Sequence, residues 1–210
     1  MEVFKNSNFY IILNIYPNKG EFKMELNVKV GVSNRHIHLT EDVYYQLFDE
    51  EPTVKSKLYQ PGMVAYNQTV TIKANERIIE NVRILGPFRD YNQVEISATD
   101  ARYLKLNPPI RQSGDLNGAE DITIISDKAT IDLKESCIIA KRHLHILPED
   151  AIKYGIADDE ALSIVVDRED GGILLCYAKV APNSALEIHL DTDNANALGI
   201  KQDDIVKLVK

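Results

Sequence analysis

The sequence predicts a mainly β fold made of two β-barrels related by an internal repeat, with short capping α-helices. Its 210 residues contain many short segments in which apolar and polar residues alternate, as expected of half-buried strands. Helical patterns are few and short, which favours closed barrels over a doubly wound parallel sheet. The motif Arg-His-x-His occurs twice, at 35–38 and 142–145, each time shortly before a helical pattern.

The strands follow one another through most of the chain. We expect them over residues 27–32, 69–73, 78–85, 93–97, 121–125, 129–133, 137–140, 161–166, 173–180, 185–190 and 205–208. Gly171-Gly172 predicts a tight hairpin between the two strands on either side of it, because glycine accepts the backbone conformations of such turns.

Four short helices interrupt the strands. One is predicted over 40–48 with Thr40 as its N-cap, and another over 148–154, which begins with proline and ends at Gly155. Residues 100–104 and 193–198 are expected to form single turns, each begun by an aspartate.

The repeat divides the chain into two halves, about 28–106 and 138–200. Each half contains a strand, Arg-His-x-His, a short helix, several strands, and a Glu-Ile-x strand followed by a short helix. Residues 107–117 between them are rich in proline, glycine and polar residues and are expected to form a loop. Residues 1–24 precede the first strand and are interpreted as a dispensable N-terminal extension.

Composition narrows the classes of partner. A formal net charge of −8 argues against a nucleic-acid surface, which would need a basic face. The apolar stretch 9–16 is too short to span a bilayer, so no membrane partner is expected. Cys137 and Cys176 lack zinc-type or redox-type spacing, which predicts two reduced packing residues in a cytoplasmic protein.

The histidines predict metal sites. All five occur in the two repeated pairs and at His189. Residues two apart in an extended chain project to one face, so each pair can bind one ion. His189 would complete the second site. The repeat places Ser97 opposite His189 in the first half, but hydroxyls are weak ligands, and Glu95 on the same face supplies a carboxylate instead.

Three protein ligands leave a coordination position for water or substrate, as in catalytic zinc sites. Imidazole and carboxylate suit Zn²⁺ best, although manganese, iron or cobalt would accept the same ligands.

A second set of residues predicts anion binding. Arg89 follows the turn at Gly86-Pro87 and precedes Glu95 by six positions, and arginine suits two-pronged phosphate recognition. Gln60-Pro61-Gly62 is a turn that could cover a pocket, and Ser113-Gly114 offers a hydroxyl on a flexible backbone; neither segment indicates a function by itself.

Taken together, these segments resemble the phosphate propanoyltransferase (PduL-type phosphotransacylase) family. The likeness covers about residues 28–210 and rests on the combination and order of the motifs. The motifs are Val-Ser-Asn-Arg-His-Ile-His-Leu at 32–39, Gln-Pro-Gly at 60–62, Ile-Leu-Gly-Pro-Phe-Arg at 84–89, Val-Glu-Ile-Ser at 94–97, Ser-Gly at 113–114, Lys-Arg-His-Leu-His at 141–145, Glu-Ile-His at 187–189 and Asp-Asn-Ala-Asn at 193–196. Met63-Val64 departs from the more polar residues expected there, which affects the details of the lid that the resemblance implies at about 49–67.

The resemblance implies a fold, a reaction and a ligand set. Residues 25–34 and 141–210 would form barrel one, with the first strand swapped in, and 35–140 would form barrel two with a lid at about 49–67. One zinc ion would be held by His36, His38 and Glu95, and the other by His143, His145 and His189. The CoA contacts would be Ser33, Lys57, Arg83, Leu85, His189 and Asn196, and the phosphate contacts Arg89 and Ser113.

The implied reaction is reversible: acyl-CoA plus phosphate gives acyl phosphate plus CoA, with a propanoyl or acetyl group. The resemblance also implies a homodimer, free in the cytoplasm or inside a bacterial microcompartment with its shell or core proteins as partners. We expect direct transfer in a ternary complex, with Arg89 neutralising the phosphoryl group and a metal-bound CoA sulfur as nucleophile.

Three other functions remain open at this point. A binuclear metal-dependent hydrolase would use the same open sites, with Glu41 or Glu149 as base, although both suit the first turn of a helix. A cupin-like barrel also uses His-x-His, but the duplicated motif disfavours it. A non-catalytic metal-binding module is the third.

Overall fold

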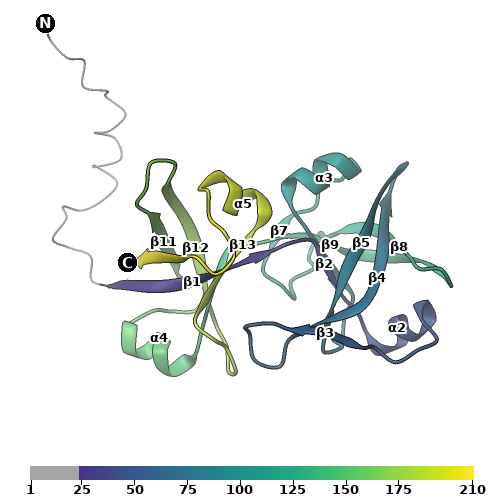
Figure 1. Cartoon of the computed structure of the whole chain (residues 1–210), viewed down its shortest axis with the longest axis horizontal. Coiled ribbons are helices and arrows are strands. Elements are labelled where there is room, and N and C mark those ends of the chain that lie inside the picture. Colours follow the sequence, from purple (N-terminus) through teal and green to yellow (C-terminus); the bar gives the residue numbers. More distant parts are fainter. Residues whose placement is uncertain (1–23) are drawn as a thin grey trace, which may run out of the picture.

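The computed structural model describes residues 24–210, so all but the last residue of the expected N-terminal extension lies outside the described residues. Two closed six-stranded barrels lie side by side (Figure 1), which confirms the predicted fold class. Each barrel has its own hydrophobic core, and one cysteine is buried in each, Cys176 in barrel one and Cys137 in barrel two. Burial raises the pKa of both thiols to about 12.

Barrel one is built from the end of the chain and the first described strand. Neighbouring strands are β1 (Glu25–Ser33), β13 (Glu187–Asp191), β10 (His143–Ile146), β12 (Gly172–Val180), β11 (Ala161–Val166) and β14 (Ile205–Val209). Antiparallel pairing of β14 with β1 closes the ring. The predicted hairpin at Gly171-Gly172 joins β11 to β12.

Barrel two has the same order of strands. Its ring is β9 (Thr130–Ala140), β6 (Gln93–Ile96), β2 (His36–His38), β5 (Arg77–Gly86), β4 (Val64–Ala74) and β8 (Glu120–Ile125), and β8 pairs with both β4 and β9. Two short strands are added at the margins, β3 (Val54–Lys57) beside β4 and β7 (Ile110–Arg111) beside β9.

The chain crosses between the barrels twice, each time just before a His-x-His strand. Strand β1 belongs to barrel one, but β2, which follows it directly, belongs to barrel two. Strand β9 belongs to barrel two and β10 to barrel one. In both cases the donated strand runs parallel to the strand that carries the third potential ligand, β1 beside β13 and β9 beside β6. The crossovers therefore bring both His-x-His strands to the junction of the barrels.

Side chains cap the beginnings of α2 (Glu41–Leu47), α3 (Ala98–Leu104) and α5 (Thr192–Ala197), whereas α4 (Pro148–Tyr154) begins with a proline. Helix α2 is capped by the Thr40 hydroxyl, which accepts from the Val43 amide at 3.3 Å, and α4 ends at Gly155 with φ 63°, as predicted. Helix α3 begins two residues earlier than expected, because Ser97 caps it in a capping box. Helix α5 is capped by Asp191.

One strand prediction was wrong. Residues 129–133 and 137–140 form a single strand, β9, rather than two. Its apolar alternation breaks because Glu135 adopts a left-handed φ of 45° where the register with β8 shifts. An irregularity of this kind bends a strand without ending it. Every helix between residues 24 and 210 is too short or too polar to traverse a bilayer.

The core of barrel one should be sensitive to truncation at Ile188. This side chain is completely buried between β1 and β10, so Ile188→Ala should lower the free energy of unfolding by about 2–5 kcal/mol. Ile205 on β14 is 63% exposed and serves as the matched control, with an expected loss of about 1 kcal/mol or less. Urea denaturation measures both; equal losses would contradict the assignment of the core.

Candidate metal centre

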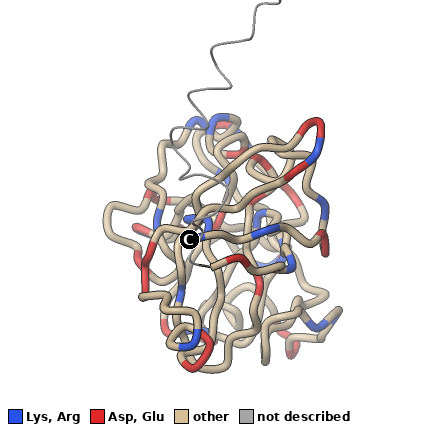
Figure 2. Tube along the Cα trace, turned by 90° about the vertical axis from the view of Figure 1, so that its left-hand side faces the viewer, with Lys and Arg blue, Asp and Glu red and all other residues tan. Residues whose placement is uncertain are grey.

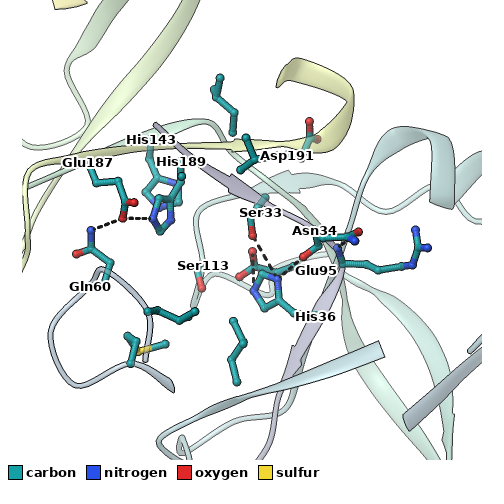
Figure 3. A pocket seen from close by; sticks show the side chains of 18 of the residues that line it. Ser33, Asn34, His36, Gln60, Glu95, Ser113, His143, Glu187, His189 and Asp191 are labelled. Carbon is teal, nitrogen blue, oxygen red and sulfur yellow. Dashed lines mark hydrogen bonds and ion pairs between the residues drawn. The ribbon is translucent and has the colours of Figure 1, made fainter. Parts of the chain in front are cut away.

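Two clusters of potential metal ligands lie at the junction of the barrels. His36, His38 and Glu95 form the first triad, in barrel two. His143, His145 and His189 form the second triad, in barrel one. Within each triad the candidate ligand atoms lie within 4.8 Å of one another. All six residues line one cavity of about 390 Å³, so the structure brings together the ligands that the sequence analysis grouped (Figure 3).

Strand pairing corrects the predicted alignment of the repeat. His36 lies opposite Glu95, and His143 lies opposite His189. Glu95 is therefore the counterpart of His189, and the expected match of Ser97 with His189 was wrong by two residues. Ser97 corresponds instead to Asp191, since both residues cap the following helix. The alignment was wrong because Glu-Ile occurs at 95–96 and again at 187–188, but these two dipeptides do not occupy equivalent positions in the strand pairing.

Backbone carbonyls orient the first histidine of each pair in the same way. His36 Nδ1 lies 2.9 Å from the carbonyl oxygen of Asn34, and His143 Nδ1 lies 2.8 Å from that of Lys141. A carbonyl only accepts, so Nδ1 carries the proton and Nε2 of the neutral ring keeps its lone pair. The His36 Nε2 lies 3.4 Å from Glu95 Oε2, and the His143 Nε2 lies 3.0 Å from His145 Nε2. This orientation is typical of metal-binding histidines.

The triads fit a divalent metal ion. The Nδ1 atom of His38 is buried and has no hydrogen-bond partner among the residues that the structure describes, and a metal would satisfy it. Burial lowers the pKa of His143 to about 3 and that of His145 to about 2, with neighbouring histidines adding to the shift. These rings are therefore neutral near pH 7. Burial opposes ionisation of Glu95, but the adjacent His36 keeps the pKa of this carboxyl well below its usual range.

A side chain two residues before each third ligand holds that ligand. Gln93 Nε2 donates to Glu95 Oε1 at 2.5 Å, and Glu187 Oε2 lies 2.7 Å from His189 Nε2. Gln93 and Glu187 occupy equivalent positions, because they pair with His38 and His145 respectively. Neither residue was predicted from the sequence, although each lies two positions before a potential ligand, and that spacing was a usable signal.

The arginine of each Arg-His-x-His motif has a structural role. Arg35 Nη1 donates to Asp100 Oδ1 at 2.8 Å, and Arg142 Nη1 donates to Asn194 Oδ1 at 2.9 Å. Both acceptors occupy the third position of the helix that follows the ligand strand. The motif therefore ties the His-x-His strand to that helix in each barrel.

Positive charge gathers in the cavity. Basic and acidic residues are interspersed along the trace (Figure 2), so an anion must be attracted locally. Arg89 Nη1 donates to Tyr91 Oη at 2.6 Å and to Ser113 Oγ at 3.1 Å, and Ser113 Oγ also accepts from Gln93 Nε2 at 2.9 Å. Arg89 is thus connected through Ser113 and Gln93 to the first triad.

Lys179 lines the same cavity and was missed by the sequence analysis. It lies on β12 opposite His145, and burial lowers its pKa. Within residues 24–210, neither Lys179 nor Arg89 has a carboxylate within 4.0 Å. Both cations are therefore available to an anionic ligand.

The residues expected to contact CoA divide into two groups. Ser33, Arg83 and Leu85 line the cavity together with His189, whereas Lys57 and Asn196 are exposed and do not. Burial lowers the pKa of Arg83, whose Nη2 donates to the Asn34 carbonyl at 3.3 Å and whose Nε has no hydrogen-bond partner within the described part of the chain. The cavity is also lined by Met63, where the sequence departs from the expected lid pattern.

The carboxylates considered as hydrolase bases do not reach the cavity. Glu41 and Glu149 are exposed in the first turns of α2 and α4, where acidic side chains suit the helix dipole.

Comparison with known proteins gives one consistent result. The family model "Phosphate propanoyltransferase" matches residues 29–201. The chain is 43% identical over 192 residues to a phosphate propanoyltransferase of Thermotoga maritima, covering 90% of this chain and 91% of the relative. It is 44% identical over 202 residues to that of Lachnoclostridium phytofermentans, covering 95% of each. It is 42% identical over 175 residues to that of Salmonella typhimurium, covering 82% of this chain and 83% of the relative. The chain that carries the two triads belongs to the phosphate propanoyltransferase family.

Proposed function

We propose that this protein transfers a short acyl group, propanoyl or acetyl, between coenzyme A and inorganic phosphate. Family membership supports phosphate acyltransferase activity. The observation that carries this proposal is one cavity lined by two potential metal triads and by two cations, Arg89 and Lys179, that have no carboxylate partner among residues 24–210. Such a cavity suits a reaction that joins a thiol, a carbonyl and a phosphate.

Two divalent cations, preferably Zn²⁺, would be held by the two triads. When bound, such ions lower the pKa of a coordinating thiol and polarise carbonyl or phosphoryl oxygens. Neutral imidazoles and the ionised Glu95 present the lone pairs that such ions need.

The chain's own residues would bind and orient the substrates. Arg89 and Ser113 would hold the phosphoryl group, since a guanidinium and a hydroxyl converge there. Ser33, Arg83 and Leu85 would contact CoA along the cavity wall. Lys57 and Asn196 are proposed contacts for parts of CoA that extend outside the cavity.

Transfer is proposed to be direct, without an acyl-enzyme. The CoA thiol would lose its proton, its sulfur would form a bond to the acyl carbon, and the bond from that carbon to the phosphate oxygen would break. Phosphate would leave with that electron pair and could take up the proton. Both cysteines are buried in the barrel cores with thiol pKa values near 12, so neither is available as nucleophile.

The binuclear hydrolase remains the second candidate, because two open metal sites would also activate water. The two carboxylates suggested for its base lie outside the cavity, which favours acyl transfer. The family resemblance further supports a homodimer, free in the cytoplasm or packaged in a bacterial microcompartment. Light scattering after size exclusion tests the homodimer.

Purified protein should form thioester from acyl phosphate and CoA. When CoA is absent, neither water nor added arsenate should consume acyl phosphate at a comparable rate. Following thioester formation and acyl phosphate loss in parallel separates the two candidate reactions. Acyl phosphate loss that does not depend on CoA would favour the hydrolase, and exchange of labelled phosphate into acyl phosphate without CoA would contradict direct transfer.

Arg89→Ala should lower kcat/KM for acyl phosphate, because the charged phosphoryl group loses the cation that binds it. The expected loss of transition-state stabilisation is about 2–4 kcal/mol. The loss should be largest in kcat, and Arg89→Lys should restore only part of it, since lysine lacks the planar fork. Steady-state kinetics measures this. Arg102, exposed on α3, provides the control Arg102→Ala, which should leave the kinetics unchanged. A fall of less than about twofold for Arg89→Ala would rule out the proposed role.

Removal of metal should abolish thioester formation, and Zn²⁺ should restore it. Elemental analysis should find two ions per chain in the wild type, and one in His38→Ala or in His143→Ala, because each variant removes a ligand from a different triad. Full turnover by metal-free protein would contradict metal dependence. Loss of both ions in each variant would contradict the assignment of two separate sites.

A further inference from the structure

The turn between β3 and β4 reaches from barrel two to barrel one. Gln60 in this turn is only 7% exposed. Its Oε1 accepts from the Ala185 amide at 3.0 Å, and its Nε2 donates to the Ala185 carbonyl at 3.1 Å. The side-chain amide thus bonds the backbone just before β13 as a neighbouring strand would. Leu58, Tyr59, Gln60 and Met63 from this turn all line the cavity.

Glu187 joins this turn to the second triad. Gln60 Nε2 also donates to Glu187 Oε2 at 2.8 Å, and the same oxygen lies 2.7 Å from His189 Nε2 (Figure 3). Glu187 is 2% exposed, and within residues 24–210 His189 is the sole basic side chain within 4.0 Å of it. A buried carboxylate depends on such hydrogen bonds, so loss of either partner is costly.

The opposite strand leaves room for this arrangement. Gly31 on β1 pairs with His189, and a Cβ atom at Gly31 would lie 2.8 Å from Glu187 Oε1 and 3.0 Å from His189 Cδ2. Any larger residue would push both side chains away. Glu187 and His189 are therefore confined between Gly31 on one side and the Gln60 turn on the other.

The first triad contacts the opposite barrel differently: Ser33 Oγ, at the end of β1, lies 3.4 Å from His36 Nδ1. Gln93, the counterpart of Glu187, bonds Glu95, Ser113 and the Gly114 amide, all within barrel two. In barrel two the Gln93 amide donates to the Glu95 carboxylate. In barrel one the Glu187 carboxylate accepts from the His189 ring instead. Among residues 24–210, a hydrogen bond from a turn of the other barrel to the partner of the third ligand occurs in the second triad alone.

We propose that the hydrogen bonds joining Gln60, Glu187 and His189 couple two events. When the turn at Gln60 docks over the cavity, they fix the position of His189 in the second triad. Glu187 is then a positioning residue, and Gln60 transmits the docked state of the turn to it. The metal part of this inference rests on the proposed function. Substrate access that lifts the turn would remove one partner of Glu187 and loosen His189, and closure would restore both.

The test compares Glu187→Gln and Gln60→Ala with a control, Asn67→Ala. Asn67 is an exposed side-chain amide at the base of the same hairpin, bonded to Thr53 Oγ1 at 3.0 Å and remote from Glu187. Chelator competition followed by elemental analysis measures the affinity of each site for Zn²⁺. Hydrogen–deuterium exchange measures docking of residues 58–63.

Glu187→Gln should weaken one of the two sites by about 10–100-fold, as loss of a ligand's carboxylate partner does elsewhere, and should speed exchange at 58–63. Gln60→Ala, which removes no group bonded to a proposed ligand, should produce both changes as well. Asn67→Ala should produce neither. Co²⁺ substituted into the weakened site should show an altered absorption spectrum in both coupled variants.

Unchanged affinity in Glu187→Gln would overturn the inference, as would faster exchange in Gln60→Ala with both sites intact, since the turn would then be only a cover. Those outcomes require two ions in the wild type. A wild type that binds no ion would contradict the metal part of the proposed function and the coupling with it, so the two failures are distinguishable.

Discussion

The site depends on one constraint of strand pairing. In each barrel, a strand from the other half of the chain runs parallel to the strand that carries Glu95 or His189. Because β1 pairs with β13 and β9 with β6, the chain must change barrel immediately before each His-x-His strand. Each pair of histidines consequently starts at the boundary between the barrels, and both triads open into one cavity. If β1 closed its own half instead, the connection would no longer direct both triads to a shared space.

The internal repeat gives the two triads equivalent positions in their barrels, but some of the residues at those positions differ chemically. His36 and His143 have the same carbonyl acceptor two residues earlier, and both motif arginines hold a helix. The third ligands differ, Glu95 against His189, and their partners Gln93 and Glu187 differ in the complementary sense. One carboxylate thus belongs to each triad, as ligand in the first and as its partner in the second. The two triads themselves present different ligand atoms, two imidazoles and a carboxylate in the first and three imidazoles in the second.

Local patterns predicted what depends on neighbouring residues. The His-x-His pairs, the Thr40 cap and the Gly155 terminus were readable because the relevant atoms lie within a few residues. Register across strands was not readable, so Glu95 was grouped with His36 and His38 from an incorrect alignment of Ser97 with His189. The β9 irregularity at Glu135 concealed a continuous strand. Gln60 and Glu187, 127 positions apart, carry no mutual signal in one sequence, and only the fold brings them together.

The distribution of charge explains how an acidic protein can hold anionic substrates. With a net charge of −8, the surface as a whole repels phosphate and CoA at long range. Inside the cavity, Arg89 and Lys179 lack carboxylate partners among the described residues, and Arg83 is partly desolvated. Desolvated cations interact strongly with an incoming anion because little water screens them. Under the proposed function, binding would be governed at short range by the walls of the cavity that both triads line.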